Sequence, residues 1–551
     1  MALSIQPASG RLDAARIERN YMAGYWRDKL VTDLLTKHAT KRPDALAIVD
    51  GERRLSWSQF HLLSQRFALH LRKLGVERGD VVALQMPNWM EYLVCFHGVR
   101  FAGAILVQLG ADWRRDEMGY GYGIGPAKVA IVPREFLGFD YPAVLKSLRP
   151  DLPGLQHILV ARGDAPEGTL SLDQILADPI EEQVSVKTLR TCRPDPDEIL
   201  RIVFTSGTTG LPKAIMHTDN TLGYLGRTVQ ADFNFDAADV VLMFVPFSTN
   251  YGVMNGLQLP MATGASVVLM DRFSASGALD LIGREKVTFA PATPTGFIAL
   301  SNSPAIPQAR LGSLRLLMSS GASFPVQSIK ELRQKFNASF IDSFGMNEFG
   351  MACWCMPDDD PDEVDGTVGR AISGVEVRVV DANGRTVPTG ETGELVIKSA
   401  NMCAGYFNQP EANASAWDED GWFHSGDLAT LDQKGYFRVV GRIKDVIVHG
   451  GANVSPREIE EILIRESRIR EVSVIGLPDE YYGEIVCACV IANPGQMPTV
   501  EEIRASLEAR VASYKLPSRV VMLEEFPLNS MGKVRKDVLK ELVLSSTDVK
   551  K

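Results

Sequence analysis

The sequence contains few cysteines: seven among 551 residues, an odd number that cannot all form intrachain disulfide bonds. The C-x-C pairs Cys353/Cys355 and Cys487/Cys489 have no neighbouring His or Cys at the spacing of a zinc site. Cys487 and Cys489 fall in the continuous apolar run 485–491, so we expect them to be buried strand residues. Reduced thiols favour a cytoplasmic protein.

Excess basic charge and long apolar runs are also missing. Lys and Arg number 58 against 68 Asp and Glu, a net charge of −10. This balance argues against a protein that coats nucleic acid, because phosphate binding requires a basic face. No apolar run reaches the ~18 residues that span a bilayer, and the first thirty residues contain no apolar stretch typical of a secretory signal. We therefore expect no nucleic-acid partner, no membrane span and no secretory signal.

What remains is an ordinary globular composition, with 45% hydrophobic and 23% charged residues. Strand and helix patterns alternate through the first part of the chain, which predicts crossover units and parallel sheets. Helical spacing occupies 60–74, 92–102 and 279–286, and buried strands are expected at 80–84, 104–107, 128–132, 157–160, 199–204, 240–245, 266–270 and 287–289. The length alone predicts several domain-sized units.

The pattern changes after Gly374 and again after Gly441-Arg442. Strands at 375–380 and 393–398, joined by Gly- and Pro-containing turns, indicate a smaller antiparallel sheet or barrel. Strands at 472–475, 485–491 and 519–523 and helices at 456–465 and 500–511 indicate a compact α+β unit. The predicted class is α/β multidomain: an N-terminal domain, 1–441, of stacked α/β sheets with a β-barrel-like subdomain, and a small mobile C-terminal domain, 442–551.

The most specific motif directly follows the strand at 199–204 and reads TSGTTGLPK. Its glycines permit close backbone approach, its hydroxyls and amides can surround phosphate oxygens, and its lysine supplies positive charge. It is not a Walker A loop, because Leu-Pro-Lys follows the second glycine. The predicted phosphate-binding residues are Thr205, Ser206, Gly207, Thr208, Thr209 and Lys213.

This motif resembles the phosphate loop of the adenylate-forming superfamily, which includes acyl-CoA synthetases and aryl-acid–AMP ligases. Further motifs follow in the same order and extend the resemblance from about Tyr25 to Lys536. The stretch 25–28 and the phrase 47–57 look similar to cyclohexanecarboxylate-type CoA ligases and to the aryl-acid–AMP ligases of siderophore synthesis. The resemblance implies ATP, Mg²⁺ and coenzyme A as cofactors.

The resemblance also implies an adenine and phosphate site. The FGMNE segment resembles a family motif in which the aromatic residue, here Phe344, packs on adenine. The glutamate of that motif, here Glu348, binds Mg²⁺, a role that suits a carboxylate. Asn347 stands where relatives have Thr, and its amide can donate to a phosphate oxygen. The stretch 320–323 lines the adenine pocket through its backbone. The other nucleotide-binding positions implied are Gly321, Ala322, Ser323, Asp342 and Gly345.

The later motifs supply the ribose site and a domain hinge. Asp427 resembles the aspartate that accepts both ribose hydroxyls, and Arg442 is expected to contact ribose or phosphate. Lys444 occupies the hinge position, Gly451 the position that lines a pantetheine channel, and Lys533 the position of the adenylation lysine. The implied mechanism forms an acyl-adenylate and then rotates the C-terminal domain, which withdraws Lys533 and brings in Gly451.

The expected activity is therefore an AMP-forming acid–thiol ligase that couples a cyclic, aromatic or medium-chain carboxylic acid to CoA. One alternative is an acid–AMP ligase that loads a carrier-protein thiol, and another is an inactive nucleotide-binding scaffold. The partners expected are the acid, ATP and CoA, with a homodimer left open. Candidate acyl-pocket residues are Tyr251, Met254, Phe349 and Met351.

Overall fold

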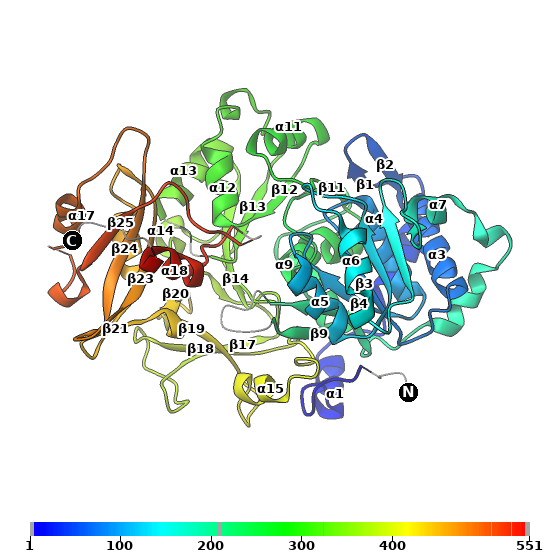
Figure 1. Cartoon of the computed structure of the whole chain (residues 1–551), viewed down its shortest axis with the longest axis horizontal. Coiled ribbons are helices and arrows are strands. Elements are labelled where there is room, and N and C mark those ends of the chain that lie inside the picture. Colours follow the sequence, from blue (N-terminus) through cyan, green and yellow to red (C-terminus); the bar gives the residue numbers. More distant parts are fainter. Residues whose placement is uncertain are drawn as a thin grey trace.

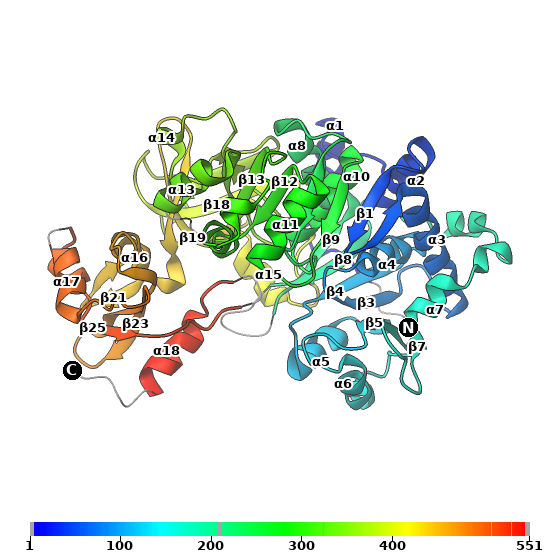
Figure 2. The same cartoon turned by 90° about the horizontal axis from the view of Figure 1, so that it is seen from above.

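A computed structural model of the chain describes residues 5–205, 212–322, 324, 326–508, 510–529 and 532–545. Within them the strands form four sheets. Figures 1 and 2 show the N-terminal half at one end of the molecule, in blue and cyan, the middle of the chain in green, and the C-terminal domain at the other end, in orange and red. This is the mixed α/β multidomain architecture that the alternating pattern predicts.

The first sheet is parallel except for its last strand, and it carries the phosphate-loop motif. Its seven strands, in order, are β7 (Leu170–Ser171), β6 (His157–Ala161), β5 (Ala127–Pro133), β3 (Val81–Gln85), β4 (Ile105–Leu109), β8 (Ile199–Phe204) and β9 (Ala214–Thr218). The helices of this half include α3 (Trp57–Lys73), α4 (Met90–Phe101), α5 (Arg115–Ile124), α6 (Tyr141–Leu148) and α7 (Leu172–Ala177).

The second sheet has nine strands with a parallel centre and antiparallel edges. Its order is β16 (Arg370–Ala371), β15 (Cys353–Trp354), β14 (Ser339–Phe344), β13 (Leu316–Ser320), β12 (Phe289–Ala292), β10 (Val240–Met243), β11 (Ser266–Leu269), β1 (Leu46–Asp50) and β2 (Arg53–Ser56). Its helices include α8 (Asp219–Asp232), α9 (Asn250–Val253), the π-helical turn η4 (Met254–Gln258), α10 (Leu259–Thr263), α11 (Ala275–Glu285), α12 (Pro294–Ser301) and α13 (Val326–Phe336). The β1–β11 pairing joins segments more than two hundred residues apart.

Two smaller sheets follow. One is antiparallel, in the order β17 (Val375–Val380), β18 (Gly393–Ser399), β19 (Phe423–Leu431) and β20 (Phe437–Arg442). Its described strands pair in a linear order, so the subdomain expected to be barrel-like is an open sheet. The other comprises β22 (Ala452–Val454), β21 (Ile447–His449), β24 (Gly483–Ala492), β23 (Ile469–Asp479) and β25 (Arg519–Met522), with α16 (Pro456–Leu463), α17 (Val500–Glu508) and α18 (Lys536–Ser545).

Local sequence explains many element boundaries. Helix α3 begins after Ser56, whose hydroxyl accepts the Gln59 amide while the Gln59 side chain accepts the Ser56 amide. This reciprocal capping satisfies donors that the first helical turn leaves free. Gly75, with a φ of +82°, allows the left-handed turn that ends the helix. The run 485–491 forms the inner part of β24, and Cys487 and Cys489 are fully buried there, as predicted.

The described part of the chain contains no helix that is long and apolar enough to cross a membrane.

Candidate active site

The sequence motifs converge where parallel strands of the two large sheets end. Phe204 ends β8, Ser320 ends β13 and Phe344 ends β14. The carboxyl ends of parallel strands are the usual place for a ligand in an α/β fold, because the following loops face a common crevice. The predicted nucleotide-binding segments therefore lie at the position that the architecture itself favours.

The stem of the phosphate loop is closed by two hydrogen bonds. The Thr205 amide donates to the Lys213 carbonyl at 3.1 Å, and the Lys213 amide donates to the Thr205 hydroxyl at 3.2 Å. The Lys213 Nζ atom lies 4.9 Å from the centroid of the Tyr406 ring, which holds the ammonium beside Glu348. Ser206, Gly207, Thr208 and Thr209 lie outside the described residues, as does Ser323 of the adenine motif.

Glu348 is a buried carboxylate with one satisfied oxygen. The Tyr406 hydroxyl donates to Oε1 at 2.9 Å, whereas Oε2 has no hydrogen-bond partner in the described part of the chain. Burial raises the pKa of this carboxyl, and the Tyr406 bond and the Lys213 and Arg442 charges act in the opposite direction. A buried acceptor without a partner is costly, so Oε2 fits a ligand position for a hard cation such as Mg²⁺.

No group of three or more His, Cys, Asp or Glu side chains among the described residues is arranged to hold a metal ion by itself. Mg²⁺ in nucleotide enzymes commonly takes only one or two protein carboxylates and completes its shell with phosphates and water. The single free oxygen of Glu348 is compatible with that pattern.

Asn347 connects three parts of the site. Its Nδ2 donates to the Phe204 carbonyl at 3.1 Å, and its Oδ1 accepts from the Asn250 amide at 3.0 Å. The phosphate contact suggested by the sequence would have to use the remaining Nδ2 hydrogen. The side chain thus ties the end of β8 to α9, directly before the phosphate loop. The preceding Gly345 is required sterically, because a Cβ atom there would lie 1.8 Å from the Gly350 carbonyl oxygen.

Asp427 and Arg442 face each other across β19 and β20. They are register partners, and Arg442 Nε donates to Asp427 Oδ1 at 2.8 Å. Burial raises the pKa of the Asp427 carboxyl, while the Arg442 and Lys533 charges lower it. Together with Lys533, the pair brings one acceptor and two cationic side chains into one place, as a ribose and phosphate site requires.

Lys533 reaches into the site from the C-terminal domain. A Cβ atom on Gly321 would lie 3.4 Å from Lys533 Cε and 3.7 Å from Nζ, so the lysine runs along the backbone of the adenine motif. The Thr295 hydroxyl of α12 donates to the Gly532 carbonyl at 3.2 Å. Asn529 holds the turn, since its side chain accepts the Lys533 amide at 3.0 Å and its amide donates to the Lys533 carbonyl at 2.9 Å.

Electrostatics at Lys533 follow from this position. Burial lowers the pKa of its ammonium to about 8; the Arg442 charge also lowers it, and Asp427 opposes both. An ammonium that has lost its water and faces another cation is stabilised by an anion in the same space. The phosphates of ATP would supply that anion.

The predicted hinge and channel residues lie elsewhere. Lys444 lies in the 3₁₀ turn η6 (Ile443–Asp445), which joins β20 to the C-terminal sheet. Burial lowers the pKa of the Lys444 ammonium. Gly451 lies in the β21–β22 hairpin with a φ of +84°, and a Cβ atom there would meet no atom within 4 Å. Gly451 at the hairpin turn is therefore exposed, while Lys533 is docked.

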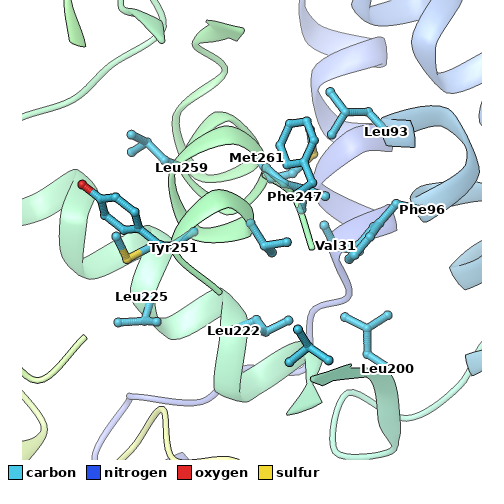
Figure 3. Packing of buried hydrophobic residues seen from close by; sticks show 14 of the residues in the cluster. Val31, Leu93, Phe96, Leu200, Leu222, Leu225, Phe247, Tyr251, Leu259 and Met261 are labelled. Carbon is cyan, nitrogen blue, oxygen red and sulfur yellow. The ribbon is translucent and has the colours of Figure 1, made fainter. Parts of the chain in front are cut away.

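The candidate acyl-pocket residues are buried beside the nucleotide segments. Tyr251 donates its hydroxyl to the Met318 carbonyl of β13 at 2.6 Å. Figure 3 shows Tyr251 in a buried apolar cluster with Leu222, Leu225 and Phe247, and its hydroxyl points away from these three residues. Met254, Phe349 and Met351 belong to the same cluster. Asp342 is also buried, which raises its carboxyl pKa to about 7, and its Oδ1 accepts the Ser343 amide at 3.0 Å.

Sequence reasoning missed three polar residues near the site: Tyr406, His217 and Arg201. Tyr406 bonds Glu348, and His217 Nε2 lies 2.8 Å from both the Asn347 carbonyl oxygen and Asn250 Nδ2. Arg201 is buried in β8. None is part of a local motif; a single arginine inside the apolar strand 199–204 was the one visible signal.

Known proteins resemble the chain along most of its length. The family described as AMP-binding enzyme matches residues 35–407, and the AMP-binding enzyme C-terminal domain matches 458–533. A medium-chain fatty-acid–CoA ligase of Escherichia coli (strain K12) is 33% identical over 526 residues, covering 95% of this chain and 92% of that protein. A 2,3-dihydroxybenzoate-AMP ligase of Bacillus subtilis (strain 168) is 31% identical, covering 94% and 95%.

Solved structures share the fold. The anthranilate CoA ligase AuaEII in complex with anthranoyl-AMP superimposes with a TM-score of 0.85 at 27% identity, covering 95% of this chain and 98% of that one. ATP-bound MatB from Rhodopseudomonas palustris has a TM-score of 0.84 at 27% identity, covering 94% and 99%.

Proposed function

Because this chain belongs to the family of AMP-binding enzymes, we propose that it is an ATP-dependent acyl-CoA ligase. It activates a carboxylic acid as acyl-AMP, releases pyrophosphate, and transfers the acyl group to CoA with release of AMP. The observation that carries the proposal is the docking of Lys533 beside Gly321, in the site that also holds Glu348 and the Asp427–Arg442 pair.

The first half-reaction brings a carboxylate to the α-phosphorus of ATP, and the two anions repel each other. Positioning and charge neutralisation therefore matter more than proton transfer. Lys533, Arg442 and Lys213 supply positive charge from three different segments. Asp427 receives the ribose, the Phe344 ring packs on adenine, and the backbone at 321–322 and Asp342 line the adenine pocket. Thr205 and Lys213, at the described ends of the phosphate loop, would contact the phosphates.

Glu348 would hold Mg²⁺ through Oε2, which has no hydrogen-bond partner among the described residues, and the bound ion would neutralise charge on the phosphates. Tyr406 orients the carboxylate by its bond to Oε1. Among the described residues, this carboxylate is the protein group that best fits the ion.

The second half-reaction needs space for a thiol where Lys533 now lies. We assign residues 1–441 and 442–551 to two domains and place the hinge at Lys444. Rotation there would withdraw Lys533 and bring Gly451 to the site as part of the CoA channel. Domain closure of this kind often limits turnover.

The acid is cyclic, aromatic or medium-chain, and its body packs against Tyr251, Met254, Phe349 and Met351. One relative is named for a medium-chain fatty acid and another for dihydroxybenzoate, which supports this range. The latter is named for the AMP step and not for CoA, so a carrier-protein thiol is the alternative acceptor. Retention of Lys533, Glu348 and Asp427 disfavours an inactive scaffold.

ATP–pyrophosphate exchange with a panel of such acids tests the proposal. Exchange that depends on one acid class, followed by CoA-dependent AMP release, is the expected result. Exchange without CoA-dependent release, but with transfer to a carrier protein, would favour the alternative acceptor. No exchange with any acid would contradict the proposed function.

A further inference from the structure

A group of buried polar side chains lies on the face of β8 that is turned toward the second large sheet. Arg201 is fully buried on β8, and its register partner on β9 is His217. Gln108, on the adjacent strand β4, accepts a hydrogen bond from Arg201 Nη1. The group occupies the interior of the protein, where a charged side chain ordinarily requires a partner.

Arg201 lacks a carboxylate partner within the part of the chain that the structure describes. Its Nε and Nη2 atoms make no hydrogen bond, and no carboxylate there forms an ion pair with it. Burial lowers the pKa of its guanidinium to about 9. Arg100, which is equally buried, shows how this chain pairs an arginine elsewhere: its Nε donates to Asp219 Oδ2 at 2.7 Å.

The same group is bonded to the segment that begins the candidate acyl pocket. The Tyr92 hydroxyl donates to the Phe247 carbonyl at 3.1 Å, and Gln108 Nε2 donates to the same carbonyl at 3.2 Å. His217 Nε2 lies 2.8 Å from Asn250 Nδ2, and among the described residues the Oδ1 atom of Asn250, like Arg201 Nε and Nη2, has no hydrogen-bond partner. Buried polar atoms that lack a hydrogen-bond partner among the described residues, on Arg201 and Asn250, therefore lie close to residues 247–250.

The distance from Arg201 to the end of β8 is similar to the length of an acyl chain. Arg201 precedes Phe204 by three residues, which corresponds to about 10 Å along an extended strand. In the proposed function, the reacting carboxylate would lie beyond Phe204, on the side of Lys533. Val203, between the two positions, belongs to the same buried apolar cluster as Phe247 and Met254.

We propose that the acid substrate carries an acceptor oxygen, in a second carboxylate or a carbonyl, at the end distant from its reacting carboxylate, and that Arg201 binds this oxygen through Nε and Nη2. A carboxylate offers two acceptors to the planar guanidinium and also balances its charge, so it is the stronger ligand. This inference rests on the proposed function and narrows its substrate class. A tail made only of hydrocarbon would leave the buried guanidinium unpaired.

Matched pairs of acids test the inference in the wild-type enzyme. The kcat/KM of ATP–pyrophosphate exchange is measured for heptanoate against heptanedioate, octanoate against octanedioate, and octanoate against 7-oxooctanoate. We expect the acid with the distal oxygen to be preferred by about tenfold or more, the size expected for hydrogen bonds to a charged group. Preference for the diacid over the oxo acid identifies the second carboxylate, and equal preference identifies any acceptor oxygen.

The Arg201→Met variant removes the donors but keeps an unbranched side chain. We expect the preference ratio to fall toward one, mainly through a higher KM for the diacid. The matched control is Leu200→Met, a volume-conserving change one residue away on β8, which should keep the wild-type ratio. Arg201→Lys retains the charge without the planar fork and should give an intermediate ratio.

Two results would overturn the inference while leaving the proposed function intact. One is a wild-type preference for the plain hydrocarbon acid in every pair, which would mean that water satisfies Arg201. The other is an unchanged ratio in Arg201→Met. Because the first comparison uses only the wild-type enzyme, it decides the matter even if the variant fails to fold. Absence of exchange with all of these acids and with the wider panel would count against the proposed function itself.

Discussion

The C-terminal domain presents two edges to very different surroundings. At one edge Lys533 lies against Gly321, and Gly532 accepts a hydrogen bond from Thr295 of the large domain. At the other edge the β21–β22 hairpin leaves Gly451 exposed, with no atom within 4 Å of a Cβ placed there. If each edge serves one half-reaction, this domain orientation suits adenylation, and the second step requires the domain to turn.

Loss of the docked lysine is expected to have the largest effect. Lys533→Ala should lower ATP–pyrophosphate exchange by about 10²–10³-fold, since a group aimed at developing negative charge typically contributes that much. Formation of acyl-CoA from supplied acyl-AMP should be retained, because Lys533 would then be withdrawn. The two partial reactions are measured separately, by radiolabelled pyrophosphate incorporation and by loss of free thiol.

Lys536→Ala is the matched control for that experiment. Its ammonium donates to Glu460 Oε1 at 2.8 Å and to the Val474 carbonyl at 3.0 Å, both within the C-terminal domain. The change removes a lysine three residues away without touching the site, so the ratio of the two partial reactions should stay as in the wild type. An equal loss of both reactions in Lys533→Ala would contradict the comparison of the two edges.

The opposite edge gives the next largest expected effect. Gly451→Phe should keep ATP–pyrophosphate exchange and lower acyl-CoA formation by at least about tenfold. A large side chain would fill the narrow channel and obstruct CoA, just as an oversized side chain does not fit a well-packed core. Gly495→Phe is the control: Gly495 also has a positive φ, +75°, and open surroundings, so it reproduces the backbone strain. If both variants lose acyl-CoA formation equally, strain and not the channel is responsible.

Much of the fold was predictable because its determinants are local. The apolar run 485–491 appears as β24, and Ser56 with Gln59 caps α3 through neighbouring residues. Pairings between distant segments were not predictable. Strand β1 was not expected at all, because its partner β11 lies more than two hundred residues further along the chain. The subdomain after Gly374 was expected to be barrel-like, but strand spacing does not determine whether a sheet closes.

The residues of the candidate site also divide into those that local sequence predicts and those that it does not. Residues that belong to a motif, such as Glu348, Asp427 and Lys533, could be named from the sequence because their neighbours identify them. Tyr406 and Arg201 could not, because their importance arises from contacts made only on folding. The fold brings Tyr406 onto Glu348, fifty-eight residues away, and surrounds Arg201 without a carboxylate partner in the described residues.

The proposed hinge at Lys444 offers a way to hold the C-terminal domain in its present orientation. Lys444 is the second residue of a 3₁₀ turn, and two other 3₁₀ turns of this chain, Arg149–Asp151 and Ile306–Gln308, have proline at that position. Lys444→Pro is therefore compatible with the docked pose and should restrict rotation out of it. We expect exchange within about twofold of wild type and acyl-CoA formation reduced about tenfold.

The control here is Lys444→Ala, which removes the side chain but leaves the backbone free. It should carry out both partial reactions, so that any selective defect of Lys444→Pro is assigned to φ restriction. Normal acyl-CoA formation by the proline variant would show that the chain turns at another residue.

The smallest expected effect is a difference in pH dependence between the two partial reactions. Burial lowers the pKa of the docked Lys533 to about 8, so the ammonium is lost as pH rises through that value. The kcat/KM of exchange reports groups of the free enzyme and should fall about tenfold per pH unit above about 8. Transfer from supplied acyl-AMP should rise over the same range, because a thiol with a pKa near ~8.5 becomes more ionised.

The rates of exchange and of transfer would change with pH in opposite directions only if Lys533 leaves the site between the two steps. A withdrawn lysine regains its hydration and its ordinary pKa. Lys533→Arg provides the internal check, because a guanidinium stays protonated throughout this range and should remove the alkaline decline from whatever exchange remains. A decline near pH 8 in both partial reactions would mean that the lysine stays docked during transfer, and the two edges of the domain would then not alternate.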